Sequence, residues 1–179
     1  MNREQILHRR IRWLTALFII GLFLSGATAI PLRTEVKVLV HLLAGGPPEV
    51  LAWLHQVQGA LGQTRAQYPF LFYGTDWLAF GHFIIALAFV GAWRDPVRNR
   101  WLYDFGIMAC VLVIPYALVF GAHRGIPMWW RLLDCSFGVI GFLPLWLCRR
   151  WALELERQNS KGTKTQTADE RGFEEATGD

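Results

Sequence analysis

Residues 76–93 read DWLAFGHFIIALAFVGAW, and this stretch decides the fold of the chain. After its first residue it contains one titratable side chain, His82, and tryptophans stand near its two ends. A bilayer core about 30 Å thick needs about 20 mostly apolar residues in a helix, and indole rings favour the headgroup layers. The stretch therefore predicts a membrane-spanning helix, with a buried helix of a water-soluble protein as the alternative.

Three more apolar runs of similar length accompany it, at residues 13–30, 101–121 and 129–148. The chain has 179 residues, of which 53% are hydrophobic and 18% charged, a balance more typical of a membrane protein than of a soluble domain. We predict one all-α polytopic membrane protein, a bundle of four transmembrane helices. Residues 94–100 and 122–128 are the expected turns between the later spans.

The first run has a competing interpretation. Residues 1–12 are basic, the following run is apolar, and small residues stand at positions 27–29, a pattern that also occurs in cleavable signal peptides. We favour an uncleaved anchor because the whole run of residues 13–30 is long enough to span and further spans follow it.

Residues 31–75 form the longest connection and contain a predicted amphipathic helix at residues 48–67. Pro48 suits the first turn of a helix, and Glu49 suits the positive end of its dipole. Apolar residues recur along one side of this segment, among them Leu51, Leu54 and Leu61. We expect this helix to lie on the membrane surface or to cap the bundle, with contact to a partner protein as the alternative.

Small side chains predict where the spans pack together. Helical spacing places three sets on common faces: Gly21, Ser25 and Thr28; Gly81, Ala88 and Ala92; and Asp134, Gly138 and Gly141. Gly106 and Cys110 offer a fourth small face.

Arginine density predicts the orientation. Residues 1–12 hold four arginines, residues 94–100 hold three, and two follow the last span, so all three segments are expected on the cytoplasmic side. Both termini are then cytoplasmic in the plasma (inner) membrane, and residues 31–75 and 122–128 are extracytoplasmic. The basic residues border apolar spans, which argues against a nucleic-acid patch. The tail, residues 149–179, starts as a helical extension and then becomes polar and largely disordered.

Six polar side chains are expected near the outer ends of the spans and form the candidate binding or structural cluster: Asp76, His82, His123, Arg124, Arg131 and Asp134. Ionisable groups within spans are functional candidates. The simplest interpretation is a structural network, because Arg131 and Asp134 are three residues apart and can form an ion pair on one helix.

Two alternatives assign chemistry to this cluster. His82 and His123 are the candidate ligands of haem or of a metal ion, although one lies inside its span and the other beyond it. A third hypothesis is a membrane enzyme or transporter subunit that holds an anionic substrate with Arg124 and Arg131, without a recognisable catalytic motif. The cysteines Cys110, Cys135 and Cys148 have no zinc-type spacing.

The leading hypothesis is a non-catalytic accessory or assembly component. Its expected partners are the lipid bilayer and either another membrane protein or further copies of the same chain. A pair between Arg100 and Asp104, four residues apart, is expected at the cytoplasmic end of the third span.

Overall fold

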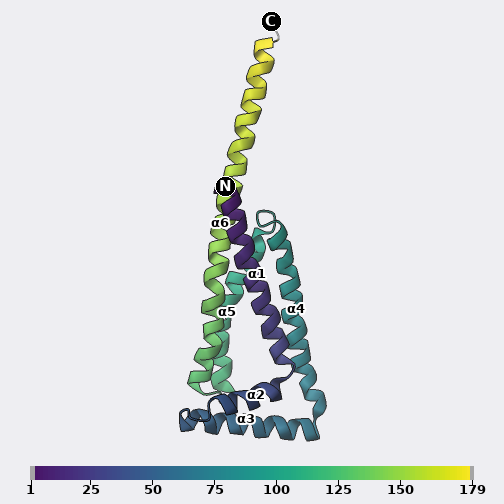
Figure 1. Cartoon of the computed structure of the whole chain (residues 1–179), viewed down its shortest axis with the longest axis vertical. Helices are drawn as coiled ribbons and strands as arrows, with labels where there is room; N and C mark the ends of the chain where they lie inside the picture. The colour runs from purple at the N-terminus through teal and green to yellow at the C-terminus, as the bar shows by residue number, and fades with distance from the viewer. Residues whose placement is uncertain (1–2, 178–179) are drawn as a thin grey trace. The chain divides into compact units, whose positions relative to one another are not determined.

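The structure is a computed structural model that describes the backbone of residues 3–177 and the side chains of residues 3–160. Within that range it contains six α-helices and one short 3₁₀ helix, and no strand (Figure 1). In chain order these are α1 (Arg3–Ala29), α2 (Leu32–Leu42), α3 (Pro48–Gln67), η1 (Pro69–Phe72), α4 (Tyr73–Arg94), α5 (Arg100–His123) and α6 (Met128–Thr177).

Four helical segments are long and apolar enough to cross a membrane. They are Arg3–Ala29, Pro69–Arg94, Arg100–His123 and Met128–Ser160. In the most apolar window of each segment, at most 22% of the residues are buried inside the protein. Large apolar side chains exposed in such numbers suit contact with lipid rather than with water. The prediction of an all-helical chain with four apolar helices is confirmed.

The chain divides into two compact units, and each is described by itself. The first unit contains Met1–Phe18 and Ala88–Asp179, and the second contains Ile19–Leu87. The helices α1 and α4 therefore each contribute to both units.

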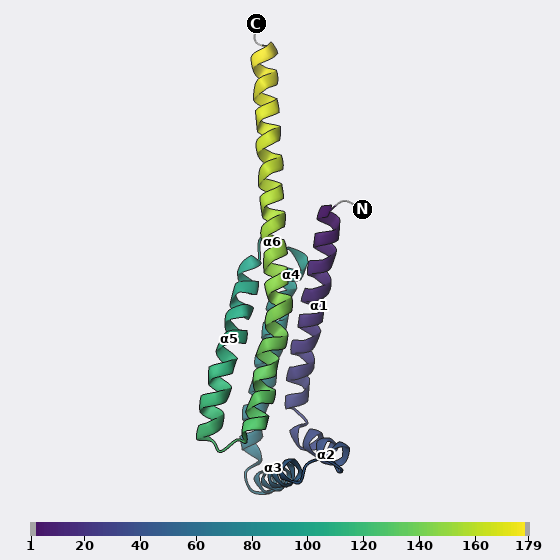
Figure 2. The same ribbon diagram turned by 90° about the vertical axis from the view of Figure 1, so that its left-hand side faces the viewer.

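In the first unit, α5 and α6 lie side by side and run in opposite directions (Figures 1 and 2). Gly125, with a φ of 70°, closes the turn between them in a conformation that other residues rarely adopt. A Cβ added at Gly138 would lie 2.5 Å from the carbonyl oxygen of Cys110, so only glycine permits this close approach. Gly106 similarly accommodates Leu145. The packing role predicted for these glycines and for Cys110 is confirmed.

The core of the first unit surrounds three fully buried side chains on different helices. These are Ile11 of α1, Phe89 of α4 and Tyr103 of α5. The Phe89 ring contacts both Tyr103 and Phe18, with ring centroids 6.4 Å and 4.8 Å away. Burying aromatic side chains of this size contributes more to stability than any single polar contact.

In the second unit, α1 approaches α4 at Gly26. A Cβ at this position would lie 2.8 Å from the Cβ of His82 and 3.0 Å from the carbonyl oxygen of Ala79. The predicted packing positions Gly21 and Gly81 are wrong, because a Cβ added at either would meet no described atom within 4 Å. Spacing alone gave several faces of small residues and could not select the one that meets a neighbouring helix.

The connection between α1 and α4 differs from the expectation at α2. The sequence predicted one helix in the connection of residues 31–75, at residues 48–67, whereas the structure has a further helix over residues 32–42. Helical spacing brings Leu32, Val36 and Leu39 to one side, and Val36 is buried. In the second unit α2 packs beside α3, and α3 runs across the direction of α4 (Figure 1).

The last helix is longer than expected. The backbone of α6 is helical to Thr177, whereas the composition of residues 151–179 favours a polar tail that loses its structure. Lysine, glutamate, glutamine, alanine and arginine are frequent after Trp151, and all of them are good helix formers. The last two residues lie outside the described range.

Candidate functional site

A buried polar network joins four helices of the first unit, α1, α4, α5 and α6. The hydroxyl oxygens of Thr15 and Tyr103 are 2.9 Å apart, and the Tyr103 hydroxyl donates to the carbonyl oxygen of Ala92 at 3.3 Å. The Cys148 sulfur lies 3.8 Å from the hydroxyl of Thr15 and donates to the carbonyl oxygen of Ile11. Each polar atom has a partner, so this network stabilises the helix packing and has no group left to bind a ligand.

Among the described side chains of the first unit, three arginines form ion pairs with carboxylates of other helices. Arg3 contacts Glu154 at 2.6 Å, Arg100 contacts Glu156, and Arg149 contacts Asp104. The prediction that Arg100 pairs with Asp104 is wrong, because both side chains reach across to α6. Partial exposure limits what these pairs contribute to stability.

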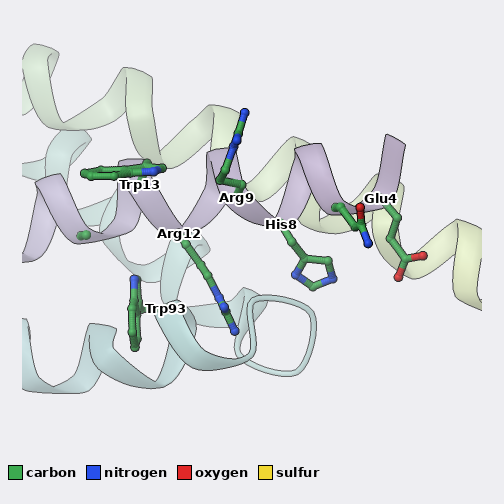
Figure 3. A pocket seen from close by; sticks show the side chains of 8 residues that line it. Glu4, His8, Arg9, Arg12, Trp13 and Trp93 are labelled. Atoms are coloured by element: carbon green, nitrogen blue, oxygen red, sulfur yellow. The ribbon is translucent and has the colours of Figure 1, made fainter. Parts of the chain in front are cut away.

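A hollow lies along the N-terminal part of α1, within the first unit (Figure 3). It has a volume of about 730 Å³ and opens to the surface. Its lining residues are Glu4, Gln5, His8, Arg9, Arg12, Trp13 and Ala16 of α1, and Trp93 of α4. We call it the α1 groove.

The α1 groove changes in character along its length. Glu4 and His8 lie at one end, and Trp13 and Trp93 lie at the other (Figure 3). Arg9 and Arg12 lie between these ends and extend to opposite sides of the groove. The guanidinium carbon of Arg12 is 5.6 Å from the centroid of the Trp93 ring, a cation–π contact that holds this side chain at the groove. Two cations thus separate a polar end from an aromatic end.

Four residues of the predicted polar cluster belong to the first unit. His123 and Arg124 are exposed, and Arg131 and Asp134 are half-buried. Arg131 donates to the carbonyl oxygen of Leu118 at 3.1 Å, and its Nε is buried without a partner. The predicted ion pair between Arg131 and Asp134 is wrong for the described part of the chain, because Arg131 turns toward α5 instead.

The other two residues of that cluster, Asp76 and His82, belong to the second unit. Asp76 is exposed near the start of α4. His82 is half-buried, and its Nδ1 lies 2.8 Å from the carbonyl oxygen of Leu78. A carbonyl accepts only from N–H, so Nδ1 is protonated and the Nε2 of a neutral ring is an acceptor. Nε2 is then the atom with which His82 can bind a ligand.

Among the residues that the structure describes, no group of three or more His, Cys, Asp and Glu side chains lies close enough together to hold a metal ion. The assignment of His82 and His123 to haem or a metal stays a prediction. His123 is exposed and His82 is half-buried, and the two belong to different units.

A second, smaller hollow of about 220 Å³ lies in the second unit, between the start of α2 with the turn that precedes it, the end of α3, and η1. Arg33 and Arg65 contribute to its lining together with Ile30, Pro31, Thr34, Pro69 and Phe72. It is less than a third of the size of the α1 groove and has no aromatic pair.

Sequence reasoning did not find the α1 groove. The arginines of residues 1–12 were interpreted only as determinants of membrane orientation, although their spacing also places some of them on one face of a helix. Residues 5, 9, 12, 13 and 16 recur at helical intervals, which places arginine and tryptophan on one stripe. The contribution of Trp93 depends on tertiary packing and has no signal in the sequence.

Comparison with known proteins found no match to a family model, to a curated protein or to a solved structure. The class of the protein therefore follows from its own architecture: an all-helical chain whose four apolar helices are consistent with a small membrane protein.

Proposed function

We propose that the chain is a small integral protein of the plasma (inner) membrane with four spans and both termini in the cytoplasm. It acts without catalysis, as an accessory or assembly component whose extracytoplasmic face contacts a partner protein or lipid. The observation that carries this proposal is the set of four helices that are each long and apolar enough to cross a bilayer.

The distribution of arginines supports the orientation. Four lie at positions 1–12, three at 94–100 and two at 149–150, and all of these flank the ends of apolar segments. Lysine and arginine near span ends are retained in the cytoplasm. Residues 31–75 and 122–128 are then extracytoplasmic.

The segment from α2 to α3 is the surface that we assign to contact. Val38 and Leu42 of α2 are 50% and 72% exposed, although both are large and apolar. In α3, Trp53 and Val57 are half-buried and Leu54 is buried, whereas polar Gln56 and Gln63 are exposed. Exposed apolar residues on α2 are expected to lie in the outer leaflet or against another protein.

Photo-crosslinking in intact cells tests this assignment. A photoreactive amino acid replaces Leu42, and the mass of the adduct identifies lipid, another protein or a second copy of the chain. The matched control replaces Gln63, which is exposed and polar. We expect adducts from position 42 and few from position 63. Equal labelling at both positions, or none at position 42, would contradict the assignment of α2 as the contact surface.

A further inference from the structure

The α1 groove combines a polar end, two arginines and an aromatic end in one hollow. Phospholipids have the same order of chemistry, with a charged head group, a phosphate diester and apolar acyl chains. We propose that the α1 groove binds an anionic phospholipid, with Arg9 and Arg12 facing its phosphate from the two sides of the groove and Trp13 and Trp93 beside the upper acyl chains. This inference rests on the proposed membrane insertion.

The charges in the groove favour an anion from outside the chain. In the described part of the first unit, Arg3, Arg100 and Arg149 each form an ion pair with a carboxylate. The ion pairs of the described residues include neither Arg9 nor Arg12. Arginine binds phosphate through its planar array of donors, and such contacts are stronger than hydrogen bonds between neutral groups. Among the described residues that line the groove, Glu4 is the one acid, and it lies at the far end from the tryptophans.

The aromatic end distinguishes a lipid from a free anion. Trp13 is 73% exposed and begins the apolar run of α1, and Trp93 is 39% exposed near the end of α4. Indole rings favour the boundary between head groups and acyl chains. In the proposed orientation this places the arginines at the level of the lipid phosphates, in the cytoplasmic leaflet, where basic pockets beside membrane helices bind anionic head groups.

The size of the groove also fits. Its volume of about 730 Å³ is far larger than an inorganic phosphate needs. Sites for organic ligands occupy about 300–1,000 Å³. A head group with the first part of its acyl chains therefore fills the groove, whereas a free phosphate would leave the aromatic end empty.

Native mass spectrometry of the full-length protein in detergent tests the proposal. The probes are phosphatidylglycerol and phosphatidylcholine with identical acyl chains, which differ in net charge. The test variant is R9Q/R12Q. The matched control is R94Q/R98Q, which removes the same charge from exposed positions outside the groove.

We expect phosphatidylglycerol to bind the wild type more tightly than phosphatidylcholine does. R9Q/R12Q should weaken phosphatidylglycerol binding by about tenfold or more, as expected for the loss of two charge-assisted contacts. R94Q/R98Q should change it less than about twofold. An equal loss in both variants, or no preference between the lipids, would overturn the proposal. If millimolar inorganic phosphate displaces phosphatidylglycerol, the groove binds a free anion, and this result would overturn the proposal of a lipid site.

A second measurement needs no variant. Phosphatidylglycerol with a photoreactive acyl chain is added to the wild-type protein, and labelled peptides are mapped. We expect labels on the peptides that contain residues 13–16 and residue 93. Labels confined to other segments would contradict the assignment, even where R9Q/R12Q does not fold.

Different results would contradict the lipid site and the proposed membrane insertion. Extraction of the protein from membranes by alkaline carbonate would contradict membrane insertion itself. A protein that resists carbonate and shows no phosphatidylglycerol preference would contradict only the lipid site.

Discussion

The hydroxyl of Thr15 lies 2.9 Å from that of Tyr103, and both residues are fully buried in the first unit. Since the Tyr103 hydroxyl donates to the carbonyl oxygen of Ala92, the Thr15 hydroxyl is the donor between the two. One chain of hydrogen bonds thus connects α1, α5 and α4. Such a chain specifies which face of α1 packs inward, because any rotation would leave buried polar atoms without partners.

A double-mutant cycle on this pair should reveal coupling. Thr15→Val and Tyr103→Phe each remove one hydroxyl, and each should lower the free energy of unfolding by about 1–2 kcal/mol. The double variant should lose less than the sum, by about 1 kcal/mol, because the second change removes a group already without its partner. Denaturation in detergent micelles measures these values. Strict additivity would mean that the two hydroxyls do not interact.

Gly138 should tolerate no larger side chain. Gly138→Ala places a Cβ against the backbone of Cys110, which cannot move aside as a side chain can, and should destabilise the fold by about 1–3 kcal/mol. The control is Gly81→Ala, where a Cβ meets nothing within 4 Å. That change should be neutral or stabilise α4 by up to about 1 kcal/mol. Melting temperatures in detergent compare the two, and equal effects would argue against close packing of α6 on α5.

Removing the charge of Asp134 should not weaken the fold. This half-buried carboxylate has no ion pair among the described residues, and an ionised group near lipid is unfavourable. Asp134→Asn should leave stability unchanged or raise it by up to about 3 kcal/mol. Asp104→Asn, which breaks the pair with Arg149, should instead lower it by up to about 1 kcal/mol. A lower melting temperature for Asp134→Asn would indicate a required partner.

Cysteine labelling tests the proposed orientation. In a variant without its native cysteines, Ala60→Cys should react with a membrane-impermeant maleimide in intact cells. Arg98→Cys should react only after permeabilisation. Both positions are exposed, so burial does not account for a difference between them. The reverse pattern would invert the topology.

An optical spectrum tests the haem alternative. The non-catalytic proposal predicts no absorbance band above the tryptophan peak in purified protein, either oxidised by air or reduced by dithionite. A Soret band that sharpens on reduction and disappears in His82→Ala would instead support haem ligation and replace the accessory role as the leading function.

The predicted polar cluster shows how far prediction from the sequence extends. Asp76, His82, His123, Arg124, Arg131 and Asp134 could be selected because ionisable residues near apolar spans are rare. Their partners could not be predicted. Arg131 bonds to the carbonyl oxygen of Leu118, made accessible by the absence of a side chain at Gly121, where a Cβ would lie 2.5 Å from the Arg131 stem. A backbone acceptor has no residue-type signature, so only the packing of α6 on α5 shows it.

The sequence by itself determined the helical class and the four apolar segments. These properties depend on local composition and on the length needed to cross a bilayer, and both can be counted along the chain. The tertiary structure decided which small face packs, which arginines are paired, and that Trp93 joins Arg9 and Arg12 at the α1 groove. Those properties depend on the rotation and register of helices distant in sequence, which a helical pattern alone leaves open.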